Sequence, residues 1–210
     1  MKKNVFVLGD SYSTYKGYIP EGYYTYYSDE RDEAPIIKGV EKTWWHRFAK
    51  KTDANIVVND SWSGSTICNT MREAFPIESS FINRIDKYIS EGFFEKNKID
   101  RVLILGGTND CGIKAPLGAL KYSSFTAEDL KCILPAFCYL IDRLKDFVED
   151  IVVILNTEYL TEEVIKGFIS VCEKYGLKYI CLEGIERENG HPTELGMKQI
   201  CDQVSKFLAN

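Results

Sequence analysis

Five short apolar segments recur along the 210-residue chain, and they constrain its fold more than any other feature. Each segment is apolar on both alternations, which is typical of a strand covered on both faces and therefore of a parallel sheet. The segments are NVFVLG (4–9), NIVVND (55–60), RVLILGG (101–107), DIVVILN (150–156) and KYICLE (178–183).

The longer stretches between these segments carry apolar residues at helical spacing. Pro135 should kink or divide one of the helices, because proline lacks an N–H and clashes with the preceding turn. Gly176 suits the position just after a helix, and Pro192 suits the first position of the last one. We expect helices over 42–52, 80–96, 126–149, 161–176 and 193–209.

Strands that alternate with helices form right-handed crossovers and a sheet with helices on both faces. We therefore predict an α/β fold, a three-layer α/β/α sandwich around a parallel sheet of about five strands in flavodoxin-like order. The length suits one domain over residues 1–210. Residues 12–43 interrupt the pattern as a tyrosine-rich insertion, which we expect to be ordered because each ring has a large apolar area to bury.

Composition excludes several classes of protein. Hydrophobic residues make up 45% and charged residues 27% of the chain, as in globular proteins. The net charge of −5 argues against a nucleic-acid partner, and no apolar run approaches the roughly 18 residues of a membrane helix. The opening MKKNVFVLGD has too short an apolar stretch for a signal peptide, so we interpret it as the first strand. Seven cysteines without a C-x-x-C pair argue against a disulfide framework and a zinc site, and they favour reduced thiols in a cytoplasm.

Four loops should meet at the carboxyl edge of the sheet, where ligand sites form in open α/β folds. Ser11 follows the first strand, Gly64 the second and Asn109 the third, while His191 stands just ahead of the last helix. Together they offer a hydroxyl, a glycine N–H, a carboxamide and an imidazole. This is the set of groups that an acyl-transfer site needs.

The sequence blocks that carry these residues are GDSYS (9–13), SWSGSTI (61–67), GGTND (106–110) and GHPTELG (190–196). In order and spacing they resemble the four blocks of the SGNH hydrolases, also called GDSL-type esterases. The resemblance implies that Ser11 is the nucleophile and His191 the general base. It also implies an oxyanion hole made of the backbone N–H groups of Ser11 and Gly64 and the side-chain amide of Asn109.

Glu188 stands where the family usually has an aspartate, three residues before the histidine. Two arrangements are open at this point. Glu188 completes a catalytic triad, or a backbone carbonyl orients the ring of His191 in a Ser–His dyad. Either way, a serine hydroxyl needs a base within hydrogen-bond reach, and each fixed donor to the oxyanion is worth roughly 10²–10³ in rate.

Other polar residues near the blocks are expected to have structural roles. Asp10 should cap the turn after the first strand, and Asp110 should be a loop or helix-cap carboxylate. His46 is expected to be a structural histidine on an amphipathic helix. Arg72 and Arg84 are expected to lie on solvated helix faces.

Aromatic residues supply the candidate substrate wall. Tyr12, Tyr15 and Trp62 are the predicted substrate-binding residues. Trp44 and Trp45 are adjacent and cannot share a helix face. We therefore expect one of these two to pack in the core and the other to line the pocket.

The predicted function is that of a serine ester hydrolase that works through an acyl-enzyme without a metal or a cofactor. The expected substrate is a small-molecule ester, with a carbohydrate O-acetyl ester favoured because aromatic rings stack on sugar faces. A lysophospholipase or thioesterase is the alternative within the same chemistry. A non-catalytic carbohydrate-binding module is the alternative from another class.

Overall fold

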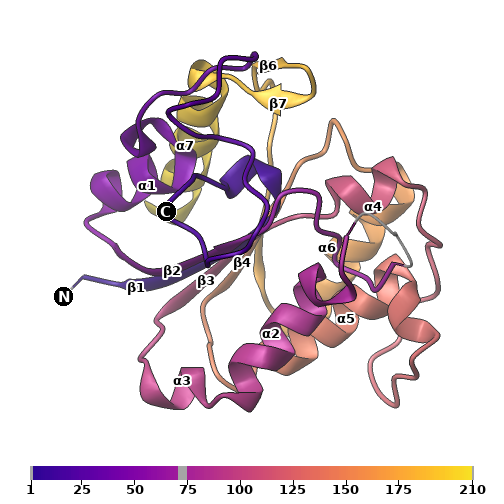
Figure 1. The fold of residues 1–210 in the computed structure, drawn as a ribbon. Helices are drawn as coiled ribbons and strands as arrows, with labels where there is room; N and C mark the ends of the chain where they lie inside the picture. Colours follow the sequence, from indigo (N-terminus) through magenta and orange to yellow (C-terminus); the bar gives the residue numbers. More distant parts are fainter. Residues whose placement is uncertain (1, 71–74, 210) are drawn as a thin grey trace.

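The computed structural model describes residues 2–70 and 75–209. Its centre is a five-stranded parallel sheet in the order β2–β1–β3–β4–β5 (Figure 1). The predicted α/β/α sandwich and its flavodoxin-like strand order are thereby confirmed. The strands are β1 (Asn4–Gly9), β2 (Asn55–Ser61), β3 (Arg101–Leu105), β4 (Ile151–Leu155) and β5 (Lys178–Cys181).

Helices cover both faces of the sheet (Figure 1). The first face carries α1 (Trp44–Thr52) and α7 (Glu194–Ala209), and the second carries α2 (Phe81–Ser90), α5 (Ile133–Leu144) and α6 (Glu162–Tyr175). Side chains of β1 alternate between the two cores, because successive residues of a strand point to opposite faces. Val5 and Val7 belong to the first core, and Phe6 and Leu8 to the second.

Two expected helices have different bounds from those predicted. The stretch 80–96 divides at Gly92, whose φ is +66°, so that a short α3 (Phe93–Lys96) follows α2. The stretch 126–149 holds a 3₁₀ turn, η4 (Asp129–Lys131), and then α5. Pro135 lies in the first turn of α5, where a missing N–H costs nothing, so it neither kinks nor divides that helix. Gly176 ends α6 in the left-handed conformation, as predicted.

A small antiparallel hairpin precedes the last helix, and the sequence did not predict it. It consists of β6 (Arg187–Glu188) and β7 (His191–Pro192). Pro192 therefore ends a strand and does not begin α7, so that prediction was wrong. The N-terminal end of α7 is capped by Thr193, whose Oγ1 accepts a hydrogen bond of 3.1 Å from the N–H of Gly196.

The tyrosine-rich insertion, residues 12–43, is ordered by its own rings. Tyr12, Tyr15 and Tyr27 are buried, and the hydroxyl of Tyr27 donates to the carbonyl of Pro192 at 2.8 Å. The 3₁₀ turn η1 (Ser11–Ser13) overlaps the start of the segment, and the 3₁₀ turn η2 (Val40–Lys42) lies near its end. The insertion thus lies against the hairpin from the opposite end of the chain (Figure 1).

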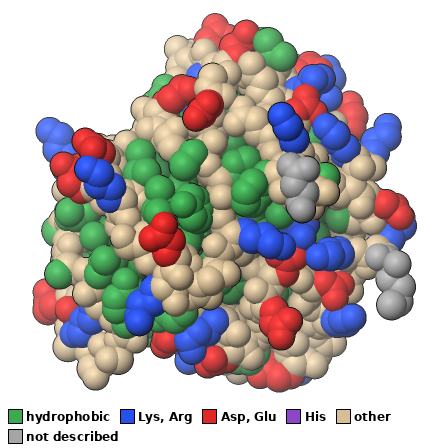
Figure 2. Space-filling view, turned by 180° about the vertical axis from the view of Figure 1, so that it is seen from behind, with side chains coloured by type: hydrophobic (Ala, Val, Ile, Leu, Met, Phe, Trp, Pro, Cys, Tyr) green, Lys and Arg blue, Asp and Glu red, His purple; other side chains and the backbone are tan. Residues whose placement is uncertain are grey.

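The face seen from behind carries Lys, Arg, Asp and Glu side chains interspersed around apolar patches (Figure 2). All seven cysteines are free thiols. Within residues 2–70 and 75–209, none of the helices has both the length and the apolar character that crossing a membrane requires.

Candidate active site

Ser11 lies at the carboxyl end of β1, at the start of the tight turn η1. Asp10 caps this turn as predicted, because its Oδ1 accepts a hydrogen bond of 3.1 Å from the N–H of Tyr12. The indole N–H groups of Trp44 and Trp45 both donate to Ser13, at 3.0 Å to its Oγ and 2.9 Å to its carbonyl oxygen. Both tryptophans are buried. The expectation that one of them lines a pocket was therefore wrong, and the pair instead holds the turn that carries Ser11.

His191 lies beside Ser11, although 180 residues separate the two in sequence. Its Nε2 is 3.0 Å from Ser11 Oγ, and its Nδ1 is 3.2 Å from the carbonyl oxygen of Asn189. A carbonyl oxygen can only accept a hydrogen bond, so the proton of the neutral ring belongs on Nδ1. Nε2 is then the acceptor for the hydroxyl of Ser11, as a general base requires.

The turn of the hairpin brings Asn189 and His191 into this arrangement. Asn189 and Gly190 both have positive φ, +49° and +76°, which an asparagine and a glycine tolerate. The turn is held to the rest of the fold at two points. Asn189 Nδ2 donates to Ala34 O at 3.0 Å, and the hydroxyl of Tyr12 donates to Gly190 O at 2.7 Å.

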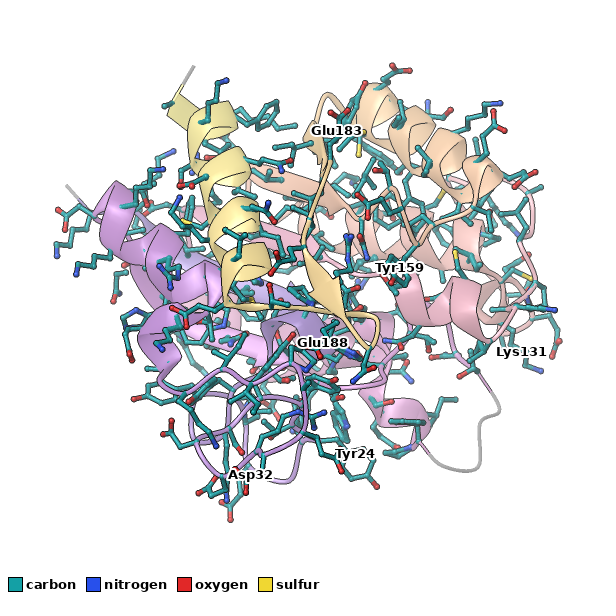
Figure 3. The ribbon with its side chains drawn as sticks, turned by 90° about the horizontal axis from the view of Figure 1, so that it is seen from above. Tyr24, Asp32, Lys131, Tyr159, Glu183 and Glu188 are labelled. Carbon is teal, nitrogen blue, oxygen red and sulfur yellow. The ribbon has the colours of Figure 1, made fainter. Side chains whose placement is uncertain are left out.

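Glu188 is the residue that pairs with His191 across the two-stranded hairpin. Its side chain is exposed, and its carboxylate has no hydrogen-bond partner within the described part of the chain. Figure 3 shows Glu188 on the hairpin, beside the insertion that carries Tyr24 and Asp32. Membership of Glu188 in a catalytic triad therefore stays a prediction.

The two other predicted oxyanion donors follow β2 and β3. Gly64 has φ of +79°, and a Cβ at this position would lie 2.2 Å from the ring of Phe75, so only glycine fits there. Asn109 lies on the short α4 (Thr108–Gly112), and its Nδ2 donates to Ser65 O at 2.8 Å. A carboxamide has two N–H donors, so one further hydrogen remains for a ligand.

Arg84 organises this edge of the sheet from within, and the expectation of a solvated position was wrong. Its side chain is 1% exposed and forms an ion pair of 2.6 Å with Asp60. It also donates to Gly9 O at 3.1 Å and to Ser65 Oγ at 3.3 Å. The guanidinium therefore joins the ends of β1 and β2 to the Gly64 loop. Helical spacing alone gave no sign of this burial, and Arg72, predicted with it, lies outside the described residues.

Two carboxyl groups of the sequence blocks are buried and have structural partners. Asp110 accepts hydrogen bonds from the N–H groups of Ile67 and Cys68, which ties α4 to the loop after β2. Burial raises the pKa of Asp10 to about 7, although the N–H of Tyr12 and the charge of Arg84 oppose the rise.

Burial also sets the basicity of the candidate base. It lowers the pKa of His191 below its ordinary value, and the positive charge of Arg31 lowers it further, whereas the hydrogen bond to Asn189 O acts in the opposite direction. The neutral imidazole, which is the form that can accept a proton, is thereby favoured.

The predicted substrate-binding residues lie in different surroundings. The ring of Tyr12 is 5.5 Å from that of His191. The ring of Trp62 stacks on that of Tyr23, with centroids 4.0 Å apart, and the exposed ring of Tyr24 lies beside it. Tyr15 is buried in the insertion, where its hydroxyl donates to Asp29. Tyr12 and Trp62 thus accompany the chain segments that carry Ser11 and Gly64, whereas Tyr15 supports the insertion itself.

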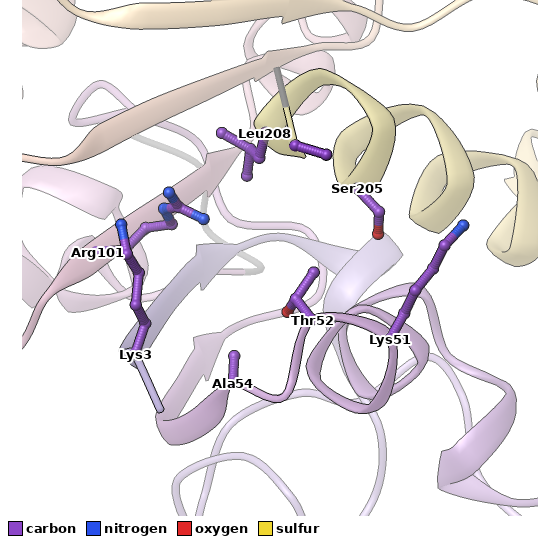
Figure 4. A pocket seen from close by; sticks show the side chains of 8 residues that line it. Lys3, Lys51, Thr52, Ala54, Arg101, Ser205 and Leu208 are labelled. Carbon is purple, nitrogen blue, oxygen red and sulfur yellow. The ribbon is translucent and has the colours of Figure 1, made fainter. Parts of the chain in front are cut away.

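A separate hollow of about 440 Å³ lies at the opposite, amino-terminal edge of the sheet (Figure 4). Its basic residues already have carboxylate partners. Lys3 and Arg101 pair with Asp150, and Lys51 pairs with Asp202. The described residues include no group of three or more His, Cys, Asp and Glu side chains that could hold a metal ion.

The chain folds as a three-layer α/β protein that brings Ser11 and His191 together at the carboxyl edge of its parallel sheet. The model of the GDSL-like Lipase/Acylhydrolase family matches residues 3–208, and the chain belongs to this family. No curated protein matches the chain.

Solved structures agree with this membership. The chain is 36% identical to a protein of Bacteroides ovatus described as a GDSL-like lipase, with a TM-score of 0.90 over 100% of this chain and 99% of that one. It is 37% identical to a similarly described protein of Bacteroides uniformis, with a TM-score of 0.89 over 99% and 96%. An aryl esterase of M. smegmatis shares the fold at 14% identity, with a TM-score of 0.64 over 99% and 98%.

Proposed function

We propose that the protein is a serine ester hydrolase that works through an acyl-enzyme at Ser11. The observation that carries the proposal is the distance of 3.0 Å between Ser11 Oγ and His191 Nε2. At this distance the imidazole can take the hydroxyl proton as the oxygen attacks an ester carbonyl.

The sequence of steps follows from these positions. His191 Nε2 accepts the proton of Ser11, and the imidazolium keeps its Nδ1–H hydrogen bond to Asn189 O. The same proton passes to the leaving alcohol, and the acyl group stays on Oγ. Water then attacks the acyl-enzyme with His191 again as the base. The N–H groups of Ser11 and Gly64 and the amide of Asn109 are the proposed donors to the oxyanion.

We assign the orientation of His191 to the carbonyl of Asn189 and thus favour a Ser–His dyad. The exposure of Glu188 and the contact of Nδ1 with Asn189 O support this choice. Glu188 as third member of a triad is the competing assignment.

The proposed substrate is a small ester, with the O-acetyl group of a carbohydrate favoured. Support comes from the aromatic side chains beside the Gly64 loop, where Tyr24 is 51% exposed next to the stacked Trp62 and Tyr23. Such rings offer flat apolar faces to a sugar. The similarity to a distant esterase concerns the fold alone, and a shared fold does not determine the substrate.

The test uses Ser11→Ala with Ser63→Ala as the matched control, because Ser63 is a half-buried serine of a neighbouring loop. Ser11→Ala should lower the hydrolysis of p-nitrophenyl acetate at least 10³-fold and abolish labelling by a fluorophosphonate. Ser63→Ala should retain both. Unchanged turnover in Ser11→Ala would refute the proposal.

The choice among substrates needs a second measurement. Acetate release from acetylated oligosaccharides should exceed hydrolysis of long-chain p-nitrophenyl esters and of lysophospholipid. The reverse order would favour a lipid acylhydrolase. Binding of the sugar without labelling of Ser11 would favour a non-catalytic module.

A further inference from the structure

The imidazole of His191 is the end of a stack of three side chains. Its ring lies on that of Tyr26, with centroids 3.5 Å apart and planes 9° from parallel. The guanidinium carbon of Arg31 lies 4.1 Å from the centroid of the same tyrosine ring. Two groups so close to one ring cannot share a face of it, so Tyr26 lies between His191 and Arg31.

We propose that Tyr26 and Arg31 are positioning residues for His191, and that the stack holds the imidazole in place and in its neutral form. This inference rests on the proposed function, since it concerns the base of that reaction. It assigns to the tyrosine-rich insertion the orienting role that a buried carboxylate has for the histidine of a triad.

The positional part follows from two perpendicular constraints. The hydrogen bond from Nδ1 to Asn189 O fixes one point of the ring but leaves it free to tilt. The face of Tyr26 removes that freedom by setting the plane of the imidazole. Tyr26 is itself held at both ends, because its N–H donates to Thr14 Oγ1 at 2.9 Å and its hydroxyl accepts from Arg31 at 3.2 Å.

The electrostatic part follows from the position of Arg31. A protonated imidazole on Tyr26 would gain a cation–π interaction, but the guanidinium already occupies the opposite face and repels the new charge. Arg31 is 21% exposed, and its nearest carboxylate, that of Glu33, is 3.8 Å away, so its charge is only partly compensated.

The other groups that face His191 do not reverse this effect. Ser11, Tyr12 and Tyr27 are neutral at pH 7, and the carboxylate of Glu188 is exposed to water. A triad carboxylate would stabilise the imidazolium, whereas here burial and Arg31 both lower the pKa of the ring. The base should therefore stay active at a lower pH than in a triad.

The experiment exploits the presence of only two histidines in the chain. The His46→Gln variant identifies which of the two imidazole signals in NMR spectra belongs to His191. The signal of His191 can then be followed as a function of pH without any substrate. Arg31→Met should raise the titration midpoint of His191 and move the acid limb of kcat/KM to higher pH, with a smaller loss at the high-pH plateau than in Tyr26→Leu. Lys16→Met is the matched control, since it removes an exposed cation of the same insertion that pairs with Glu30.

Tyr26 variants test the positional part. Tyr26→Leu should lower the plateau of kcat by about 10–100-fold, because the ring of His191 loses its support. Tyr26→Phe keeps the stacked face and should retain most of kcat, which also shows that the insertion folds.

Each part can fail separately. If Arg31→Met leaves both the titration midpoint of His191 and the acid limb of kcat/KM unchanged, the claim that Arg31 favours the neutral imidazole is overturned. If Tyr26→Leu keeps the plateau of kcat at the wild-type value, the claim that Tyr26 positions the ring of His191 is overturned. Wild-type protein that neither hydrolyses esters nor reacts with a fluorophosphonate would overturn the proposed function instead, and the substrate-free titration of His191 still reports on the stack in that case.

Discussion

The two halves of the Ser–His pair are held by different parts of the molecule. Ser11 follows a central strand, and its turn is tied to buried groups, since Asn59 and Trp45 donate to Ser13 O and Arg84 donates to Gly9 O. His191 lies on a surface hairpin whose two strands have two residues each, and Tyr26 of the insertion stacks on its ring. The sheet therefore supports the nucleophile, and the insertion supports the base.

This difference has a measurable consequence. Changes around Ser11 should alter the free energy of unfolding of the whole domain, because they remove buried contacts of the sheet. Changes around His191 should alter activity with a smaller effect on global stability, because a short surface hairpin contributes few buried contacts to the domain. Four variants, from the largest expected effect to the smallest, test this contrast.

Arg84→Met should have the largest effect. It leaves the fully buried carboxylate of Asp60 unpaired, which typically costs about 3–5 kcal/mol. Urea denaturation measures the loss. Adding Asp60→Asn should recover part of it by removing the unpaired charge, and a loss below about 1 kcal/mol would show that Arg84 is not a structural centre.

Asp10→Asn should stabilise the nucleophile side in a pH-dependent way. The carboxyl keeps its proton to about pH 7 in the folded state but loses it near 3.8 in the unfolded chain. The stability that this proton contributes is present below about pH 4 and is lost as the pH rises through 7. The amide retains the cap without titrating.

The advantage of the Asp10→Asn variant over the wild type should therefore grow between pH 4 and pH 7 and then level off, at roughly 2–4 kcal/mol. Thermal unfolding of both proteins across this range measures it. A constant difference at all pH values would contradict the raised pKa.

Gly190→Ala tests the base side. A Cβ at this position meets nothing closer than 4.0 Å, so the cost is the strain of positive φ alone, about 1–2 kcal/mol. If the turn relieves part of this strain by moving His191, kcat/KM should fall about ten-fold, with a loss of stability of no more than about 1–2 kcal/mol.

Gly176→Ala is the matched control for this variant. Gly176 has φ of +66° with open space around it and ends α6. It should lose a similar amount of stability and keep full activity. Equal activity of the two variants would show that the hairpin turn does not position His191.

Glu188→Gln should have the smallest effect, a change in kcat/KM of less than about three-fold, because the group is exposed and Nδ1 of His191 is bound by Asn189 O. Loss of the acid from a true triad lowers kcat by about 10⁴. A loss of that size would restore Glu188 as the third member and reject the dyad.

Much of this fold could be predicted from local patterns. The five apolar segments identify the parallel sheet because burial on both faces demands apolar residues at every position of a strand. The helix bounds were less predictable. Pro135 is compatible with either a break between two helices or the first turn of one, and the structure has it in the first turn of α5.

Side-chain burial was the main source of error. Arg84 was expected on a solvated helix face and one of Trp44 and Trp45 in the pocket, yet Arg84 pairs with Asp60 and both indoles donate to Ser13. Each partner lies in a different element, so no local pattern could predict the contact.

Local patterns were enough to predict the five strands, most of the helices between them and the polar residues that follow each strand, because strand and turn preferences act over a few neighbouring residues. The groups that support His191 could not be predicted in this way. Tyr26, with Arg31 on its other face, and Asn189 contact the ring of His191 from two distant parts of the chain. Their effect depends on distances, ring planes and loss of water, and these exist only once the insertion has packed against the hairpin.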